Sequence, residues 1–239
     1  SEAIRQVNAN LERLASSTDA VQDSLNLAIK DDLRNLLGGD QALTAAFEDL
    51  RMTHVDAPDG AFRLFTWNLP RSDGHHHFEG YLVVRTPQGR TIVDLKDQTA
   101  KITAPEVPEL GPDRWYGALY YEVIPVKRGG RTYYTLLGWK GYSKAETRKV
   151  IEILSFKGDK PRFGAPLFGK GRGEDQEPKR AIQARRKVCG FGAMQSMTLR
   201  YDPGLEAIIL DHLSPSRPDL AGNWAFYGPD MTHDGYFWH

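Results

Sequence analysis

The spacing of apolar residues changes along this chain from a helical period to the alternation of strands. Over the first fifty residues apolar side chains recur every three or four positions, as at Ile4, Val7 and Leu11. This spacing puts them on one face of a helix. A second stripe follows a polar break at 16–19, and a third, shorter one spans 40–50. The pattern predicts three amphipathic helices at the N-terminus.

Beyond Asp59-Gly60 the apolar period shortens to two, and turn-forming residues recur between the apolar runs. This alternation is typical of antiparallel strands. The expected strands are 61–69, 76–86, 91–95, the hairpin 116–139, 147–156, 162–168, 179–188, 196–201 and 206–213. Residues 169–178, rich in glycine and charge, predict a mobile loop. We therefore expect an α+β fold, with a helical segment at 1–55 and an antiparallel β-meander of about ten strands at 60–239.

The hairpin is the strongest local signal, because Gly129-Gly130 supplies the two-residue turn that two apolar arms need. A turn of two residues also sets the register of the arms. The predicted opposite pairs are Arg128 and Arg131, Val126 and Tyr133, Ile124 and Thr135, and Tyr120 and Trp139.

Charge and cysteine content narrow the classes of partner. The chain has 31 basic and 31 acidic residues, so it lacks the net positive charge of proteins that bind nucleic acid or anionic membranes. No apolar run is long enough for a transmembrane helix. The single cysteine, Cys189, excludes an internal disulfide and is expected to be a buried structural thiol. Because the chain opens at Ser1 without a methionine, we expect that an upstream segment has been removed.

The densest group of titratable residues is His75-His76-His77-Phe78-Glu79. If Phe78 faces the core of a strand, then His75, His77 and Glu79 share the opposite face. Two imidazoles and a carboxylate on one face are suitable ligands for a divalent metal. The alternative is an ordinary polar strand face beside a turn.

A second metal hypothesis concerns the C-terminus. Asp230, Thr232 and Asp234 place oxygen donors at alternate positions before Gly235, as in the first half of a calcium-binding loop. The acidic ligand that normally closes such a loop lies beyond the sequence, so a remote carboxylate would have to replace it. The alternative is an Asp-rich turn. Apart from these two possible metal sites, no cofactor is expected.

Asp211-His212 with Ser214 or Ser196 has the residue types of a hydrolase triad. The chain has no Gly-x-Ser-x-Gly nucleophile motif, so we assign no catalytic residue.

Aromatic residues are crowded near the C-terminus. Trp224, Tyr227, Tyr236 and Trp238 belong to a group too dense for every ring to face inward on alternating strands. They predict a binding surface for a protein or, alternatively, for a carbohydrate.

Several segments together resemble an uncharacterised family of exported bacterial proteins, and the similarity runs from about Phe62 to Tyr236. The segments are 62–68, 115–121, 134–139, 163–166 and 211–215. The resemblance implies a Gram-negative envelope location, periplasmic or associated with the outer membrane, and no reaction. The sequence thus favours a non-enzymatic envelope protein that binds a protein partner or itself. The alternatives are a metal-dependent hydrolase at His75, His77 and Glu79, aided by Asp211 or His212, and a carbohydrate-binding module.

Overall fold

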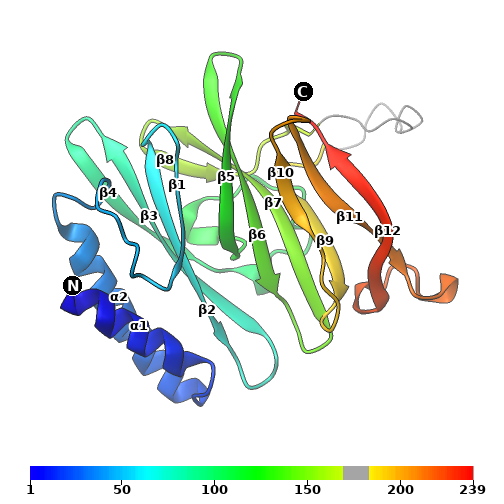
Figure 1. Cartoon of the computed structure of the whole chain (residues 1–239), viewed down its shortest axis with the longest axis horizontal. Coiled ribbons are helices and arrows are strands. Elements are labelled where there is room, and N and C mark those ends of the chain that lie inside the picture. The colour runs from blue at the N-terminus through cyan, green and yellow to red at the C-terminus, as the bar shows by residue number, and fades with distance from the viewer. Residues whose placement is uncertain (169–182, 239) are drawn as a thin grey trace.

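The computed structural model describes residues 1–168 and 183–238, which form four packed layers (Figure 1). The first layer is a pair of helices, α1 (Glu2–Leu14) and α2 (Asp19–Gly38). The other three layers are separate antiparallel sheets that contain twelve strands within the described residues. The predicted α+β class is confirmed, whereas the prediction of one continuous meander of about ten strands is wrong.

The sheets follow one another along the chain. The first sheet has the order β1 (Thr53–Asp56), β2 (Phe62–Pro70), β3 (His76–Thr86), β4 (Gly89–Lys96). The second sheet consists of β5 (Leu119–Arg128), β6 (Arg131–Gly141), β7 (Glu146–Lys157), β8 (Lys160–Phe163) and β9 (Lys187–Gly192), with β8 and β9 both paired to β7. The third sheet has the order β10 (Leu199–Asp202), β11 (Ala207–Pro215), β12 (Tyr227–Tyr236). Short 3₁₀ turns are η1 (Thr99–Lys101), η2 (Pro112–Arg114), η4 (Pro218–Leu220) and η5 (Trp224–Phe226).

The first sheet is buried on both faces, which explains why β2 lacks regular polar positions. Phe62 and Leu64 belong to the core shared with the second sheet, whereas Phe65, Trp67 and Leu69 pack in the core beneath the helices. Each large apolar side chain buried in this way contributes about 1.5–3 kcal/mol. The helices are therefore held on the sheet by the alternate residues of the same strand.

The second sheet is also buried on both faces, as strand β7 shows. Val150 and Leu154 face the first sheet, while Ile151 and Ile153 face the third. The predicted strand at 147–156 is confirmed.

The hairpin of β5 and β6 agrees with the prediction near its tip and departs from it farther along. Gly129 and Gly130 both have positive φ, which glycine adopts without strain, and Arg128 pairs with Arg131. A β-bulge after Tyr120 then shifts the register, so that Tyr120 pairs with Gly138 instead of Trp139. An extra residue in one strand produces a shift of this kind.

The predicted third helix at 40–50 is wrong, because this segment forms irregular turns. The Arg63 guanidinium, buried under the segment, donates to the carbonyls of Ala42 and Ala45 and to the Asp56 carboxylate. These tertiary hydrogen bonds take up carbonyls that a helix would use for its own backbone.

Two predictions at the C-terminal end also change, and a third is not tested. The predicted mobile loop at 169–178 lies outside the described residues. The predicted strand at 179–188 is described only from residue 183, and strand β9 begins at Lys187. The predicted Asp-rich loop at 230–235 is part of strand β12. None of the described helices combines the length and the apolar character that a membrane span needs.

Candidate functional site

A cleft of about 610 Å³ opens where the β2–β3 turn, η1 and the β6–β7 connection meet. We call it the histidine cleft. Its lining consists of Arg71, His75, His76, His77, Asp97, Gln98, Thr99, Ala100, Lys101, Ile102, Thr103, Pro105, Gly141, Tyr142 and Arg148.

Asp97, directly after β4, organises the base of this cleft, with only 3% of its side chain exposed. Its carboxylate accepts hydrogen bonds from the backbone N–H groups of Phe78, Thr99 and Gly117 and from the Thr99 hydroxyl. These donors come from β3, η1 and the segment before β5. A buried carboxylate with several N–H donors fixes the positions of the segments that supply them.

Lys140, on β6, lies fully buried beside this network. Its ammonium donates to Thr99 Oγ1 at 2.7 Å and to the Gly117 carbonyl at 2.5 Å. The charge also lies over the rings of Phe78 and Tyr116, at 4.5 and 4.3 Å from their centroids. Burial lowers the pKa of Lys140 to about 7, although the Asp97 charge opposes the shift. Because all these contacts are internal, Lys140 supports the base of the cleft and does not line it.

The three histidines have different surroundings. His77 Nε2 lies 3.4 Å from Glu79 Oε1, and its Nδ1 lies 3.8 Å from Asp97 Oδ2. The hydrogen bond to Glu79 raises the pKa of His77. His76 accepts a hydrogen bond from the Asn68 side chain at Nδ1, and burial lowers its pKa. His75 is exposed and contacts Asp73.

Glu79 shares a face with His77, as the alternation predicts, but it is held by the helix layer. Asn26 and Lys30 of α2 donate to its two oxygens at 2.8 and 3.0 Å. Burial alone would raise the pKa of Glu79, but the hydrogen bonds from His77, Lys30 and Asn26 lower it. This carboxylate thus joins α2 to β3.

The structure therefore brings together two members of the first predicted metal site and places His75 beside Asp73 instead. In residues 1–168 and 183–238, no three His, Cys, Asp or Glu side chains are grouped so that they could hold a metal ion. The metal hypothesis gains no support from this geometry.

The second predicted metal site, at Asp230, Thr232 and Asp234, has a strand conformation with a local irregularity at Met231, where φ is +70°. Asp230 accepts from the backbone and hydroxyl of Thr232 and from the Ser214 hydroxyl, and the Thr232 bonds lower its pKa to about 2. Asp234 bonds His212 at 2.8 Å. Protein donors thus occupy both carboxylates.

The pair of His212 and Asp234 predicts a specific titration. The hydrogen bond to Asp234 raises the pKa of His212, so its charged form is stabilised by the fold below the unfolded pKa, and that stabilisation is lost as the pH rises through the folded pKa. We expect an NMR titration of His212 to give a pKa above 6.5 and Asp234→Asn to lower it. Because both groups are exposed, the unfolding midpoint should change little. A His212 titration that Asp234→Asn leaves unchanged contradicts the assignment.

The surroundings of Ser214 and Cys189 bear on two further predictions, the hydrolase triad and the buried structural thiol. Ser214 donates to Asp230 and not to His212, so the structure shows no serine–histidine pair at this position. Cys189, on β9, lies at the edge of the core between the second and third sheets. Burial raises its pKa to about 12, which keeps the thiol protonated at neutral pH.

The four aromatic residues predicted as a binding surface are half-buried and make internal contacts. Trp224 packs over the backbone of Gly190, where a Cβ atom would come within 2.0 Å of the indole. The Trp238 indole donates to Thr135 Oγ1, and the Tyr227 hydroxyl accepts from Gly222 N. The Tyr236 ring packs against Phe168. Trp224 and Trp238 thus join the C-terminal part of the chain to the second sheet.

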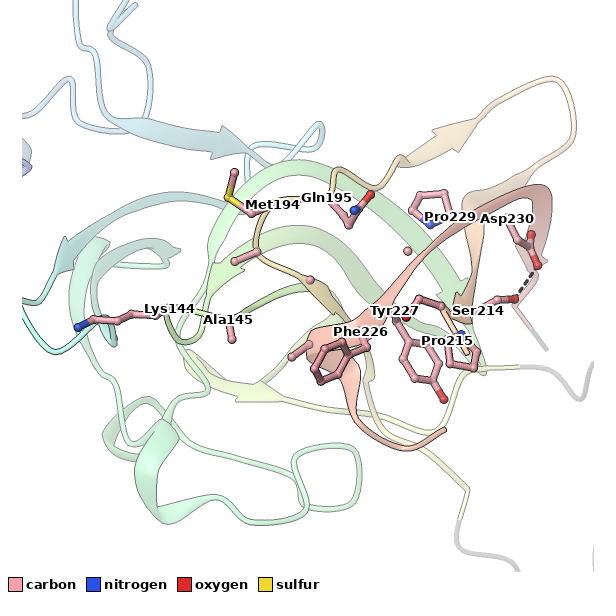
Figure 2. A pocket seen from close by; sticks show the side chains of 15 residues that line it. Lys144, Ala145, Met194, Gln195, Ser214, Pro215, Phe226, Tyr227, Pro229 and Asp230 are labelled. Carbon is pink, nitrogen blue, oxygen red and sulfur yellow. Dashed lines mark hydrogen bonds between the residues drawn. The ribbon is translucent and has the colours of Figure 1, made fainter. Parts of the chain in front are cut away.

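A neighbouring surface, which Tyr227 also lines, exposes apolar side chains. A groove of about 460 Å³ lies between the loop after β9 and the start of β12. Figure 2 shows Met194 and Gln195 on one side of it and Phe226 and Tyr227 on the other. Met194 is 97% exposed and Phe226 47% exposed. We call this the methionine groove; its lining is Lys144, Ala145, Gly192, Ala193, Met194, Gln195, Ser214, Pro215, Ser216, Ala225, Phe226, Tyr227, Gly228, Pro229 and Asp230.

Sequence reasoning singled out His75 and His77 of the histidine cleft and Tyr227 and Asp230 of the methionine groove, but it missed Asp97 and Met194. Asp97-Gln98-Thr99 after a strand is a recognisable side-chain-to-backbone turn, and Met194 is a large apolar residue between Ala193 and Gln195. Neither signal, however, says which distant segments meet there. A scan against protein-family models, a search of curated proteins and a search of solved structures each return no match, so the functional argument depends on the geometry of these two sites.

Proposed function

We propose that this chain acts by binding a partner protein and that the methionine groove receives an extended apolar segment of that partner. The observation that carries the proposal is the exposure of Met194 and Phe226 on opposite sides of one groove. Isolated exposed apolar residues are common, but two on opposite sides of one concave surface are typical of a recognition site. Methionine adapts its shape to different apolar side chains, which suits it to this role.

The polar groups of the groove fit the same occupant. Lys144 and Asp230 are the charged residues of the lining, and they have opposite signs. An uncharged segment therefore matches the groove better than a strongly acidic or basic one. Gln195 adds a side-chain amide that can pair with a peptide backbone.

Strand addition to the neighbouring β12 is less suitable as a mode of binding. Pro229 has no N–H group to donate, and the positive φ of Met231 interrupts the regular strand. Features of this kind protect sheet edges from pairing. Recognition is therefore expected to use side chains inserted into the groove.

A random peptide library displayed on phage tests this function without a known partner. We expect selection on the immobilised protein to enrich peptides with aliphatic or aromatic residues. The Met194→Ala/Phe226→Ala double variant should bind the selected peptides about tenfold or more weakly, as expected when central apolar contacts are lost. Fluorescence polarisation measures the affinities.

The matched control is Phe237→Ala, because Phe237 is 55% exposed and lies outside the groove. It should leave affinity within about twofold. Absence of enrichment, or peptides that bind the double variant as well as the original protein, contradicts the proposal. Sedimentation velocity completes the test: a dimer that the double variant abolishes would make a second copy of this chain the occupant.

The proposal includes the cell envelope as the compartment, periplasmic or at the outer membrane, and rests there on the resemblance of the sequence to exported proteins. Fractionation of cells that express the full-length gene checks this part separately.

A further inference from the structure

The lining of the histidine cleft has more cationic than acidic groups, although the whole chain carries 31 of each. Arg71, Lys101 and Arg148 reach it from three separate segments. The acidic residue of the lining is Asp97, whose oxygens already accept from four donors within the protein. The lining therefore offers a ligand mainly positive charge and hydrogen-bond donors.

The two arginines are held in place by acids outside the lining. Arg71 bonds Asp23 at 2.7 Å, and Arg148 bonds Glu146 at 2.6 Å. Arg148 also stacks on Tyr142, with its guanidinium 3.3 Å from the ring centroid. These contacts fix the directions of the guanidinium groups and offset part of their charge.

Lys101 differs from both arginines. It is exposed on η1, and it makes no ion pair within the described part of the chain. Its ammonium is thus the strongest uncompensated charge at the cleft. An anionic group is the natural partner for an ammonium in this position.

We propose that the histidine cleft binds a sugar-sized molecule that carries a carboxylate or phosphate group. The volume of about 610 Å³ is far larger than a free inorganic anion needs and lies within the roughly 300–1,000 Å³ of small-molecule sites. Lys101 and Arg148 pair with the anionic group, while Gln98 and Thr103 supply hydrogen bonds to hydroxyl groups. This site is separate from the methionine groove, so the proposal extends beyond protein binding.

Isothermal titration calorimetry at low ionic strength tests it with three probes: glucuronate, glucose 6-phosphate and glucose. We expect at least one of the two anions to bind with a Kd below about 1 mM, and glucose to bind about tenfold more weakly or worse. Raising the salt concentration should weaken the binding of the anion, because salt screens exposed charge pairs. The preferred anion identifies the group as a carboxylate or a phosphate.

Two variants separate charge from shape. Lys101→Glu should lower the affinity for the anion about tenfold or more. Lys127→Glu, at the exposed tip of the β5–β6 hairpin, should leave this affinity within about twofold of the original. Thr103→Trp should abolish binding by filling the cleft without a change of charge. Because Lys101 and Thr103 are exposed, the unfolding midpoints should stay unchanged. Failure of both anions to bind, or binding that Lys101→Glu leaves intact, overturns the proposal whatever the outcome at the methionine groove.

Discussion

Arg186→Met is expected to lower the free energy of unfolding by about 3–5 kcal/mol. Arg186 is fully buried and donates to Glu152 at 2.7 Å. It also donates to the backbone carbonyls of Pro105, Pro108 and Phe163. Its loss leaves a buried carboxylate without its cation and three carbonyls without this donor. Urea denaturation followed by circular dichroism measures the change.

The neighbouring Arg185 provides the control. It is half-buried, and Arg185→Met should change stability by no more than about 0.5 kcal/mol. Adding Glu152→Leu to Arg186→Met should restore part of the loss, since it removes the unpaired charge while the carbonyls remain unsatisfied. If Arg186→Met costs no more than the control, the ion pair does not stabilise this fold.

Asp97→Ala has the second large expected effect, also about 3–5 kcal/mol. The substitution removes the acceptor of three backbone N–H groups, at Phe78, Thr99 and Gly117. It also removes the negative charge that favours the ammonium form of buried Lys140. The same urea titration detects the loss. We further expect faster amide exchange at these three positions, because each loses its acceptor.

Asp113→Ala is the matched control, because the Asp113 side chain is 83% exposed and pairs with the exposed Lys96 at 3.1 Å. It should cost no more than about 0.5 kcal/mol. A double-mutant cycle of Asp97→Ala with Lys140→Met should give a non-zero coupling energy if the two charges interact through the base of the cleft. A loss below about 1 kcal/mol for Asp97→Ala argues against a stabilising network.

Local conformation was predictable wherever neighbouring residues decide it. The glycine pair at the hairpin tip needs positive φ whatever surrounds it, so the turn and the pairing of Arg128 with Arg131 followed from sequence. The bulge after Tyr120 did not, because a one-residue insertion leaves no distinct mark in an apolar run.

The candidate sites were predictable only in part. Alternation along β3 placed His77 and Glu79 on one face, as the structure shows. It did not indicate that Asn26 and Lys30 of the distant helix α2 bind Glu79. The exposed Phe226 and the half-buried Trp224 lie two residues apart, and composition does not distinguish them.

The sequence by itself determined that two helices precede a series of antiparallel strands, the turn of the central hairpin and the neutral charge of the chain. These features depend on residue type and spacing over a few positions. Only the tertiary structure decided that the strands form three sheets stacked beneath a helix pair, and that Arg71, Lys101 and Arg148 meet at one cleft. Stacking buries both faces of the inner sheets, and which apolar faces meet depends on contacts between residues far apart in the chain. No local pattern contains that information.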